Sequence, residues 1–247
     1  MLSMFITIIA GFFFVIGYII ALYKKDNSYL TSFSIGMAFS VLILLVCFDI
    51  IPEIKELLSH KFYLYGILSA ILGFILFKVI DIFIPHHNHE EEKKHHTHEK
   101  HLYHIGVITS LALVIHNIIE GIGIYELANY NINSGMLMAL GVGLHNLPFG
   151  LEITATLQEK NENKRFIRNN IILLFISTSV GALLGFMFGS INELFLGILM
   201  SFSVGMIFYL LIFELLEEIR ETNNKNYSVL GILCGIIIMI LTIVIGG

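Results

Sequence analysis

Eight runs of about twenty apolar residues, separated by short polar connectors, fill most of the 247-residue chain. A run of this length crosses the hydrocarbon core of a bilayer as one α-helix. Residues are 56% hydrophobic and 13% charged, which fits neither a soluble domain nor a membrane β-barrel of shorter, alternating segments. We therefore predict an all-α integral membrane protein, one transmembrane domain over residues 1–247. The predicted spans are 4–23, 32–51, 62–84, 104–125, 134–157, 167–190, 193–218 and 227–246.

Basic residues of the connectors lie almost entirely on one side of the predicted membrane. That side carries Lys24, Lys25, Lys93, Lys94, Lys100, Lys160, Lys164, Arg165, Arg168, Arg220 and Lys225. The opposite side carries Lys55 and Lys61, and Lys78 lies near the end of the third span. Because Lys and Arg favour cytoplasmic loops, we expect a multi-pass protein of the plasma (inner) membrane with both termini outside.

Two spans share a sequence motif. Residues 32–39 read "SFSIGMAF" and residues 201–208 read "SFSVGMIF", six identities in eight positions of the second and seventh spans. These spans run in opposite directions, as the members of an inverted repeat do. Inverted repeats are typical of transporters, whose binding site lies near the bilayer midplane where the repeats meet. Chance similarity between two stretches rich in Ser, Gly and Phe is the alternative.

A second pair of motifs places polar residues inside the fourth and fifth spans. Residues 116–121 read "HNIIEG" and residues 145–150 read "HNLPFG". Residues at i, i+1 and i+4 of a helix project toward one region, so His116, Asn117 and Glu120 are expected together. His145 and Asn146 are expected to do the same, and Glu152 returns to the face of His145 two turns later.

Imidazole, amide and carboxylate groups inside a bilayer are costly and normally face a bundle interior. Histidines satisfied in the core and a protonated glutamate would be the structural alternative. Their recurrence in matched motifs favours a site for a divalent metal. This donor set suits Zn²⁺, Fe²⁺ or Mn²⁺ better than Cu⁺ or Ca²⁺.

Further acidic residues lie near the ends of the two repeat-related spans. Asp49 and Glu53 stand at one end of the second span, and Glu214, Glu217 and Glu218 stand at the opposite end of the seventh. We expect Asp49, Glu53, Glu214 and Glu218 to line the pathway of a cation, although interfacial residues in water would look the same.

With these motifs the chain resembles the ZIP (Zrt/Irt-like) family of metal transporters. The resemblance covers nearly the whole chain: eight spans, a histidine-rich third connector and the two "HN" motifs. It implies a 3+2+3 arrangement with inverted outer repeats, a metal site between the fourth and fifth helices, and a homodimer. Carried over position by position, it implies metal ligands at His116, Asn117, Glu120, His145 and Asn146.

The chain also departs from the family pattern. Where the family has Pro-Glu-Gly after the fifth-span "HN", this chain has Pro148, Phe149 and Gly150. The sixth span offers Ser177, Thr178 and Ser179 where some members place a carboxylate. We therefore expect one metal rather than two, with Glu152 as a displaced ligand or a relay group.

The third connector, residues 86–104, reads "HHNHEEEKKHHTHEKHLYH" and holds eight of the eleven histidines. It is too polar to build a core, and we expect a disordered cytoplasmic segment that binds metal weakly. The histidines concerned are His86, His87, His89, His95, His96, His98, His101 and His104.

The functional hypothesis is alternating-access transport of Zn²⁺, or of Fe²⁺, Mn²⁺ or Cd²⁺, into the cytoplasm, with the metal as substrate and no organic cofactor. A membrane-embedded metal-dependent hydrolase is the rival from another class, but the chain has no His-Glu-x-x-His motif. A cation-efflux carrier is the nearer competitor, and the number of spans and the "HN" pair argue against it. The expected partners are the metal ion and the bilayer. No basic stripe for nucleic acid is present, so no nucleic-acid partner is expected. As a transporter, the chain is expected not to be an enzyme.

Overall fold

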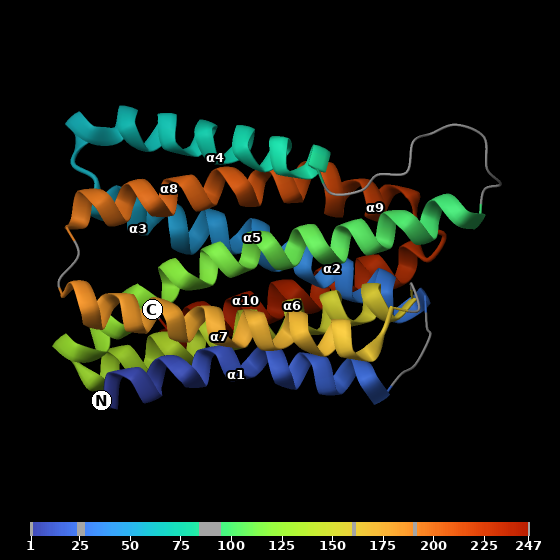
Figure 1. The fold of residues 1–247 in the computed structure, drawn as a ribbon, viewed down its shortest axis with the longest axis horizontal. Helices are drawn as coiled ribbons and strands as arrows, with labels where there is room; N and C mark the ends of the chain where they lie inside the picture. The colour runs from blue at the N-terminus through green and yellow to red at the C-terminus, as the bar shows by residue number, and fades with distance from the viewer. Residues whose placement is uncertain (1, 24–27, 84–94, 160–161, 190–191, 247) are drawn as a thin grey trace.

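The computed structural model describes residues 2–23, 28–83, 95–159, 162–189 and 192–246, with the backbone alone for residues 95–101. Within these residues, eight helical spans are long and apolar enough to cross a membrane. They lie roughly along one axis, with both termini at the same end of the bundle (Figure 1). We call this end the terminal end, and the opposite end, where α4 finishes and α5 starts, the loop end.

Most spans are single helices. They are α1 (Leu2–Tyr23), α4 (Tyr63–Phe83), α5 (His95–Tyr130), α6 (Ile132–Glu159), α7 (Lys164–Phe188) and α10 (Lys225–Gly246). The 3₁₀ turn η2 (His60–Phe62) leads into α4. The eight-span, all-helical prediction is confirmed.

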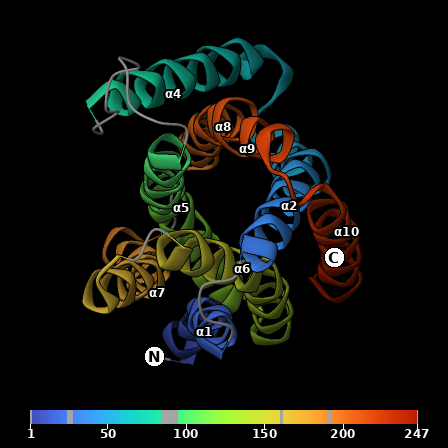
Figure 2. The ribbon, with the colours of Figure 1, turned by 90° about the vertical axis from the view of Figure 1, so that its right-hand side faces the viewer.

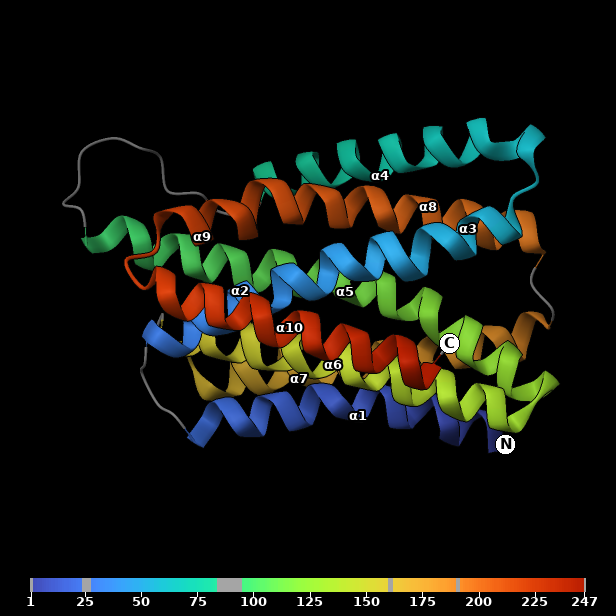
Figure 3. The same ribbon diagram turned by 180° about the vertical axis from the view of Figure 1, so that it is seen from behind.

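The second and seventh spans each contain a π-helical segment. The second consists of α2 (Ser28–Leu45), η1 (Val46–Ile50) and α3 (Ile51–Leu57), and α2 and α3 follow one another along the bundle (Figure 3). The seventh consists of α8 (Glu193–Tyr209), η3 (Leu210–Leu215) and α9 (Leu216–Glu221). A π-helical turn often marks a functional site, and each of these two turns holds a carboxylate, Asp49 in η1 and Glu214 in η3.

The contacts divide the spans into two groups. Helices α1, α5, α6 and α7 all contact one another, and we call them the site bundle. In the other group, the flanking bundle, α10 packs on α2 and α4 packs on α8 (Figure 2). These pairs are kept if the first three spans are exchanged with the last three and the fourth with the fifth, except that α10 also packs on α6 whereas α4 has no matching packing on α5 among the described residues. The 3+2+3 arrangement implied by the family resemblance gives that exchange.

Reciprocal glycines bring the paired helices close together. A Cβ on Gly36 would clash with the carbonyl of Ser228, and a Cβ on Gly231 would clash with that of Phe33. Three other pairs meet in the same way: Gly205 with Gly73, Gly17 with Gly150, and Gly121 with Gly181. Small residues that allow backbones to approach are the usual means of helix association in lipid. Gly36 and Gly205 are the glycines of the two repeat motifs, so the repeat encodes a packing contact.

Enclosure differs between the spans. Only 22% of the most apolar part of the third span is buried, against 67% for the fourth and the fifth. Phe149 is fully buried, as are Leu113 of α5 and Leu174 of α7. The two central spans are therefore shielded from lipid by the others, which allows them to carry polar side chains.

The structure describes only part of the histidine-rich tract. Residues 84–94 lie outside the described residues, and so do the side chains of 95–101, so the predictions for His86, His87 and His89 and for the side chains of His95, His96, His98 and His101 fall there. Helix α5 starts at His95, ahead of the predicted start of the fourth span at residue 104. His104 is 2% exposed and belongs to the bundle, because acidic partners from two other spans meet its ring.

Candidate metal site between the fourth and fifth spans

The two "HN" motifs face each other where α5 packs on α6. The Glu120 Oε1 atom lies 3.1 Å from His116 Nε2 on its own helix and 3.1 Å from His145 Nε2 on the neighbouring helix. One ligand atom from each of the three residues lies within 4.8 Å of the others. Ligand atoms of a tetrahedral zinc site stand about 3.4 Å apart, because each lies about 2.0–2.2 Å from the metal. The three side chains therefore form a group of a size that suits one metal ion.

The two asparagines of the motifs are fully buried beside this group, and each is held by its amide nitrogen. Asn117 Nδ2 donates to Ser177 Oγ of α7 at 3.3 Å, and Asn146 Nδ2 donates to the carbonyl of Ala10 of α1 at 3.3 Å. The Oδ1 atoms of both asparagines have no hydrogen-bond partner among the described residues. Each amide is thus anchored at its donor end, and its acceptor oxygen is unpaired.

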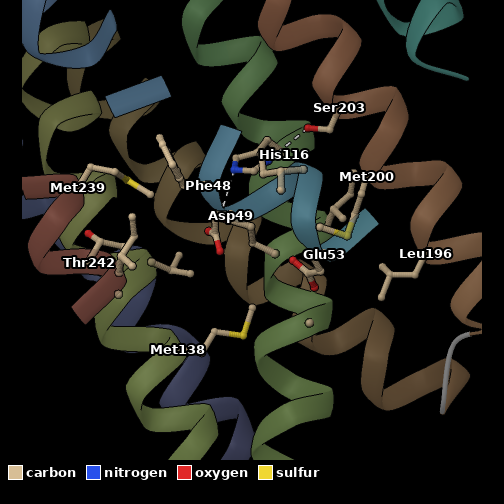
Figure 4. Close-up of a pocket in the computed structure, with 17 residues that line it drawn as sticks. Phe48, Asp49, Glu53, His116, Met138, Leu196, Met200, Ser203, Met239 and Thr242 are labelled. Atoms are coloured by element: carbon tan, nitrogen blue, oxygen red, sulfur yellow. Dashed lines mark hydrogen bonds and ion pairs between the residues drawn. The ribbon is translucent and has the colours of Figure 1, made fainter. Parts of the chain in front are cut away.

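His116 is held in the same way. Its Nδ1 lies 3.2 Å from Ser203 Oγ of α8 (Figure 4), and its Nε2 lies 3.1 Å from Glu120 Oε1. Glu120 Oε2 and His145 Nδ1 have no hydrogen-bond partner among the described residues. Buried polar groups without partners are costly in proteins, and more so in lipid. The convergence of the three ligand atoms, with buried unpaired polar atoms on the same residues and their sequence neighbours, indicates a site that is completed by a cation.

A cavity of about 140 Å³ leads to this group from the terminal half of the bundle. Asp49 and Glu53 of the second span line it together with His116 and Glu120, as Figure 4 shows for the first three. Asp49 is exposed within it and Glu53 is partly exposed. The predicted pathway residues of the second span thus share a cavity with the central site.

Glu152 lies elsewhere. It is fully buried on α6, its Oε1 accepts a 3.0 Å hydrogen bond from Thr156 Oγ1, and it is not one of the three residues that converge. It lies seven positions after His145 on the same helix, which is a rise of about 10 Å toward the loop end. The structure therefore sets Glu152 apart from the central ligand group.

A second group of ligand-type residues lies at the loop end. His104 Nε2 is 2.5 Å from Asp81 Oδ1 and 3.4 Å from Glu214 Oε1, and Tyr209 donates to Asp81 Oδ2 at 2.6 Å. We call Asp81, His104 and Glu214 the loop-end cluster; their ligand atoms also lie within 4.8 Å of one another. It joins α4, α5 and η3. The last predicted pathway residue, Glu218, is buried on α9, four residues after Glu214.

Sequence reasoning missed Asp81, Tyr209 and Ser203. Asp81 is a carboxylate within an apolar span, which was itself a signal, because such residues are rare in lipid. Ser203 is one of two serines in its copy of the repeated motif, and the motif does not indicate which of them hydrogen-bonds to a histidine.

Eight apolar spans that enclose buried groups of His, Asp and Glu define a polytopic membrane protein with ligand-type residues for a cation along its axis. Residues 85–243 match the family model described as "ZIP Zinc transporter", so the chain belongs to the ZIP zinc transporter family. This membership confirms the predicted class, a transporter of divalent metal and not an enzyme.

Relatives named zinc transporter ZupT align with nearly the full chain. The protein of Campylobacter jejuni is 26% identical over 98% of this chain and 95% of its own length. That of Oceanobacillus iheyensis is 25% identical over 99% and 98%, and that of Stenotrophomonas maltophilia is 23% identical over 93% and 90%. The similarity therefore extends over all eight spans.

Proposed function

We propose that this chain carries Zn²⁺ into the cytoplasm through a site made by His116, Glu120 and His145, with Asn117 and Asn146 beside it. The observation that carries the proposal is the convergence of three ligand atoms at the buried contact of α5 and α6. Two imidazoles and a carboxylate suit Zn²⁺, and they also suit Fe²⁺, Mn²⁺ and Cd²⁺ as competing substrates.

The cavity is the proposed entrance. Asp49 and Glu53 place two carboxylates on its wall, ahead of the central ligands. Acidic side chains in a cleft with low-dielectric walls raise the local concentration of a cation. Metal would thus be attracted to the cavity before it reaches Glu120.

The loop-end cluster is the proposed exit. Glu214 was expected on the pathway. Together with His104 and Asp81 it supplies the three ligand-type side chains that a second metal-binding position would need. In the present arrangement the three residues are bound to one another and little exposed, which supports a closed exit in this proposal. Glu152 lies between the two groups as a relay, Glu218 lies beyond the cluster, and the connector histidines of residues 86–101 would receive the ion.

We propose a single metal in the central site. Phe149 stands where the family motif has a carboxylate and is fully buried. On α7, Ser177 binds Asn117 through its hydroxyl and also donates to the carbonyl of Leu174. Neither residue supplies the anionic ligand that a second cation would require.

The direction of transport follows from orientation and charge. The basic connectors place the terminal end outside, so the cavity faces the exterior and the loop end faces the cytoplasm of a plasma (inner) membrane. A dication moving inward across about −100 mV gains about 4.6 kcal/mol, from about 2.3 kcal/mol for each charge. Uptake needs no organic cofactor, and alternating access would proceed by movement of the site bundle against the flanking bundle. A homodimer is part of this proposal on the strength of the resemblance.

The test is metal flux into proteoliposomes that contain the purified protein, with Zn²⁺, Fe²⁺, Mn²⁺ and Cd²⁺ in parallel. Saturable flux is expected, and Glu120→Ala should reduce it by more than about 100-fold, since loss of an outer-shell partner alone costs 10–100-fold. Glu193→Ala, which removes an exposed carboxylate at the start of α8, is the matched control and should leave flux unchanged. Wild-type flux from Glu120→Ala would refute the site, and metal binding without flux would refute transport.

A further inference from the structure

The hydrogen bond between His116 and Ser203 differs from the other contacts that hold the central site. Asn117 is anchored by Ser177 of α7, and Asn146 is anchored by Ala10 of α1. Both helices belong to the site bundle and contact α5 and α6 directly. Ser203 lies on α8 of the flanking bundle, is 1% exposed, and reaches His116 Nδ1 across the boundary between the two bundles.

The chemistry of imidazole gives this contact a defined role. A metal at His116 Nε2 takes the lone pair of that nitrogen, so Nδ1 carries the proton and donates it to Ser203 Oγ. Such a contact fixes the tautomer and the orientation of the ring and raises its basicity as a ligand. His145 has no such partner for its Nδ1 among the described residues. The two histidines of the site are therefore unequal, and His116 is the one that is oriented before metal arrives.

The position of Ser203 makes the contact dependent on the conformation of the protein. The hydrogen bonds that anchor Asn117 and Asn146 come from α7 and α1, within the site bundle, so these contacts would be kept if the site bundle moved as a unit. Ser203 lies on α8, which packs mainly on α4 in the flanking bundle, so the contact between Ser203 and His116 would change if one bundle moved against the other. The hydrogen bond is made here, in the arrangement in which the cavity reaches the site and the loop-end cluster is closed.

We propose that Ser203 is a positioning residue that holds His116 ready for metal while the cavity is open, and that separation of the bundles breaks this contact and weakens the site for release. The inference rests on the proposed function, since it concerns the same metal site. It adds a reason for the metal to bind tightly on one side of the membrane and leave on the other.

The test compares Ser203→Ala, Ser203→Thr and Ser201→Ala in the full-length protein. Ser201 is the matched control, because it is a buried serine of the same helix whose hydroxyl donates to the carbonyl of Gly197 in its own helix. Zn²⁺ affinity is measured by calorimetry, KM and the maximal rate by flux, and the ligand geometry from the absorption spectrum of bound Co²⁺.

For Ser203→Ala we expect Zn²⁺ affinity to fall about 10- to 100-fold, with a matching rise in KM, a smaller change in maximal rate and an altered Co²⁺ spectrum. Ser203→Thr keeps the hydroxyl and should restore affinity and spectrum, and Ser201→Ala should resemble the wild type.

Wild-type affinity and spectrum in Ser203→Ala would overturn the inference, and so would a folded Ser203→Thr that loses affinity as Ser203→Ala does. If Ser203→Ala does not fold, the Thr variant decides, because a hydroxyl that orients His116 must restore binding. The Glu120→Ala variant separates this result from the proposed function. If Glu120→Ala loses flux while Ser203→Ala behaves as the wild type, only the role of Ser203 is refuted.

Discussion

The second and seventh spans carry the same combination of motif, glycine contact and π-helical turn at opposite ends of the bundle, and the carboxylates of the two copies differ in exposure. Each span has the "SFS-x-GM" motif, a glycine against a neighbouring backbone, and a π-helical turn with one carboxylate. Asp49 of η1 is exposed in the cavity at the terminal end. Glu214 of η3 is 4% exposed and is bound in the loop-end cluster.

The difference supports the proposal that the related halves form a molecule open at one end at a time. If both halves had the same conformation, the two ends would be equivalent, and the site would be reached from both sides or from neither. The halves instead share their packing and differ in the contacts made by their carboxylates. Alternating access requires this asymmetry, together with an exchange of the two states.

The largest expected effect comes from breaking the closed end. His104→Ala removes the shared partner of Asp81 and Glu214, and loss of one member of a buried charged pair costs about 3–5 kcal/mol. That cost falls on the closed state, so the ratio of open to closed loop ends should rise about 100-fold or more.

The measurement is labelling of a cysteine placed at Thr109, a fully buried residue of α5 between His104 and His116, in a background without Cys47 and Cys234. An impermeant thiol reagent applied at the loop end should label it only in the His104→Ala protein. Ser32→Ala, which breaks a 2.7 Å contact with Thr222 inside the flanking bundle, serves as the control. Equal labelling with and without His104 would show that the cluster does not close this end.

An intermediate effect is expected where the two halves are alike. Gly36→Ala and Gly205→Ala each place a Cβ against a backbone carbonyl, and overpacking of this kind costs about 1–3 kcal/mol. Because the contacts are equivalent, the two variants should lower the thermal midpoint in detergent by similar amounts. Gly123→Ala is the control, since its Cβ would meet only the Met138 side chain at an ordinary 3.5 Å. A loss confined to one motif glycine would argue against equivalent packing.

The smallest effect is expected at the open end. Asp49→Asn removes one charge from the cavity, and a charge several ångströms from a cation in a water-filled site is worth about 1 kcal/mol. KM for Zn²⁺ should therefore rise about fivefold, with the maximal rate unchanged, and the rise should shrink at high salt. A fall in maximal rate as large as that of Glu120→Ala would make Asp49 a ligand of the site and not a guide to it.

Much of the fold was predictable because a bilayer leaves few choices. A span of about twenty apolar residues must be a helix, since its backbone groups have no other partner in lipid. The eight spans, the relation between the second and seventh, and the convergence of His116 and Glu120 follow from that rule and from helical periodicity. The family resemblance added the arrangement of the spans and the pairing of His116 with His145.

Other features depended on contacts between distant parts of the chain. The sequence pattern did not indicate that acidic side chains of two other spans meet His104. The roles of Asp81 and Ser203 were equally hidden, because each is defined by a side chain on another span.

The sequence by itself thus determined which segments cross the membrane and which residues share a helix face, since both depend on local hydrophobicity and on the period of the helix. Only the tertiary structure decided that the cavity reaches the central site from the terminal end and that Asp81, His104 and Glu214 meet at the loop end. Two related halves with the same motifs can take either state, so the choice between them lies in the contacts across the bundle and not in the motifs themselves.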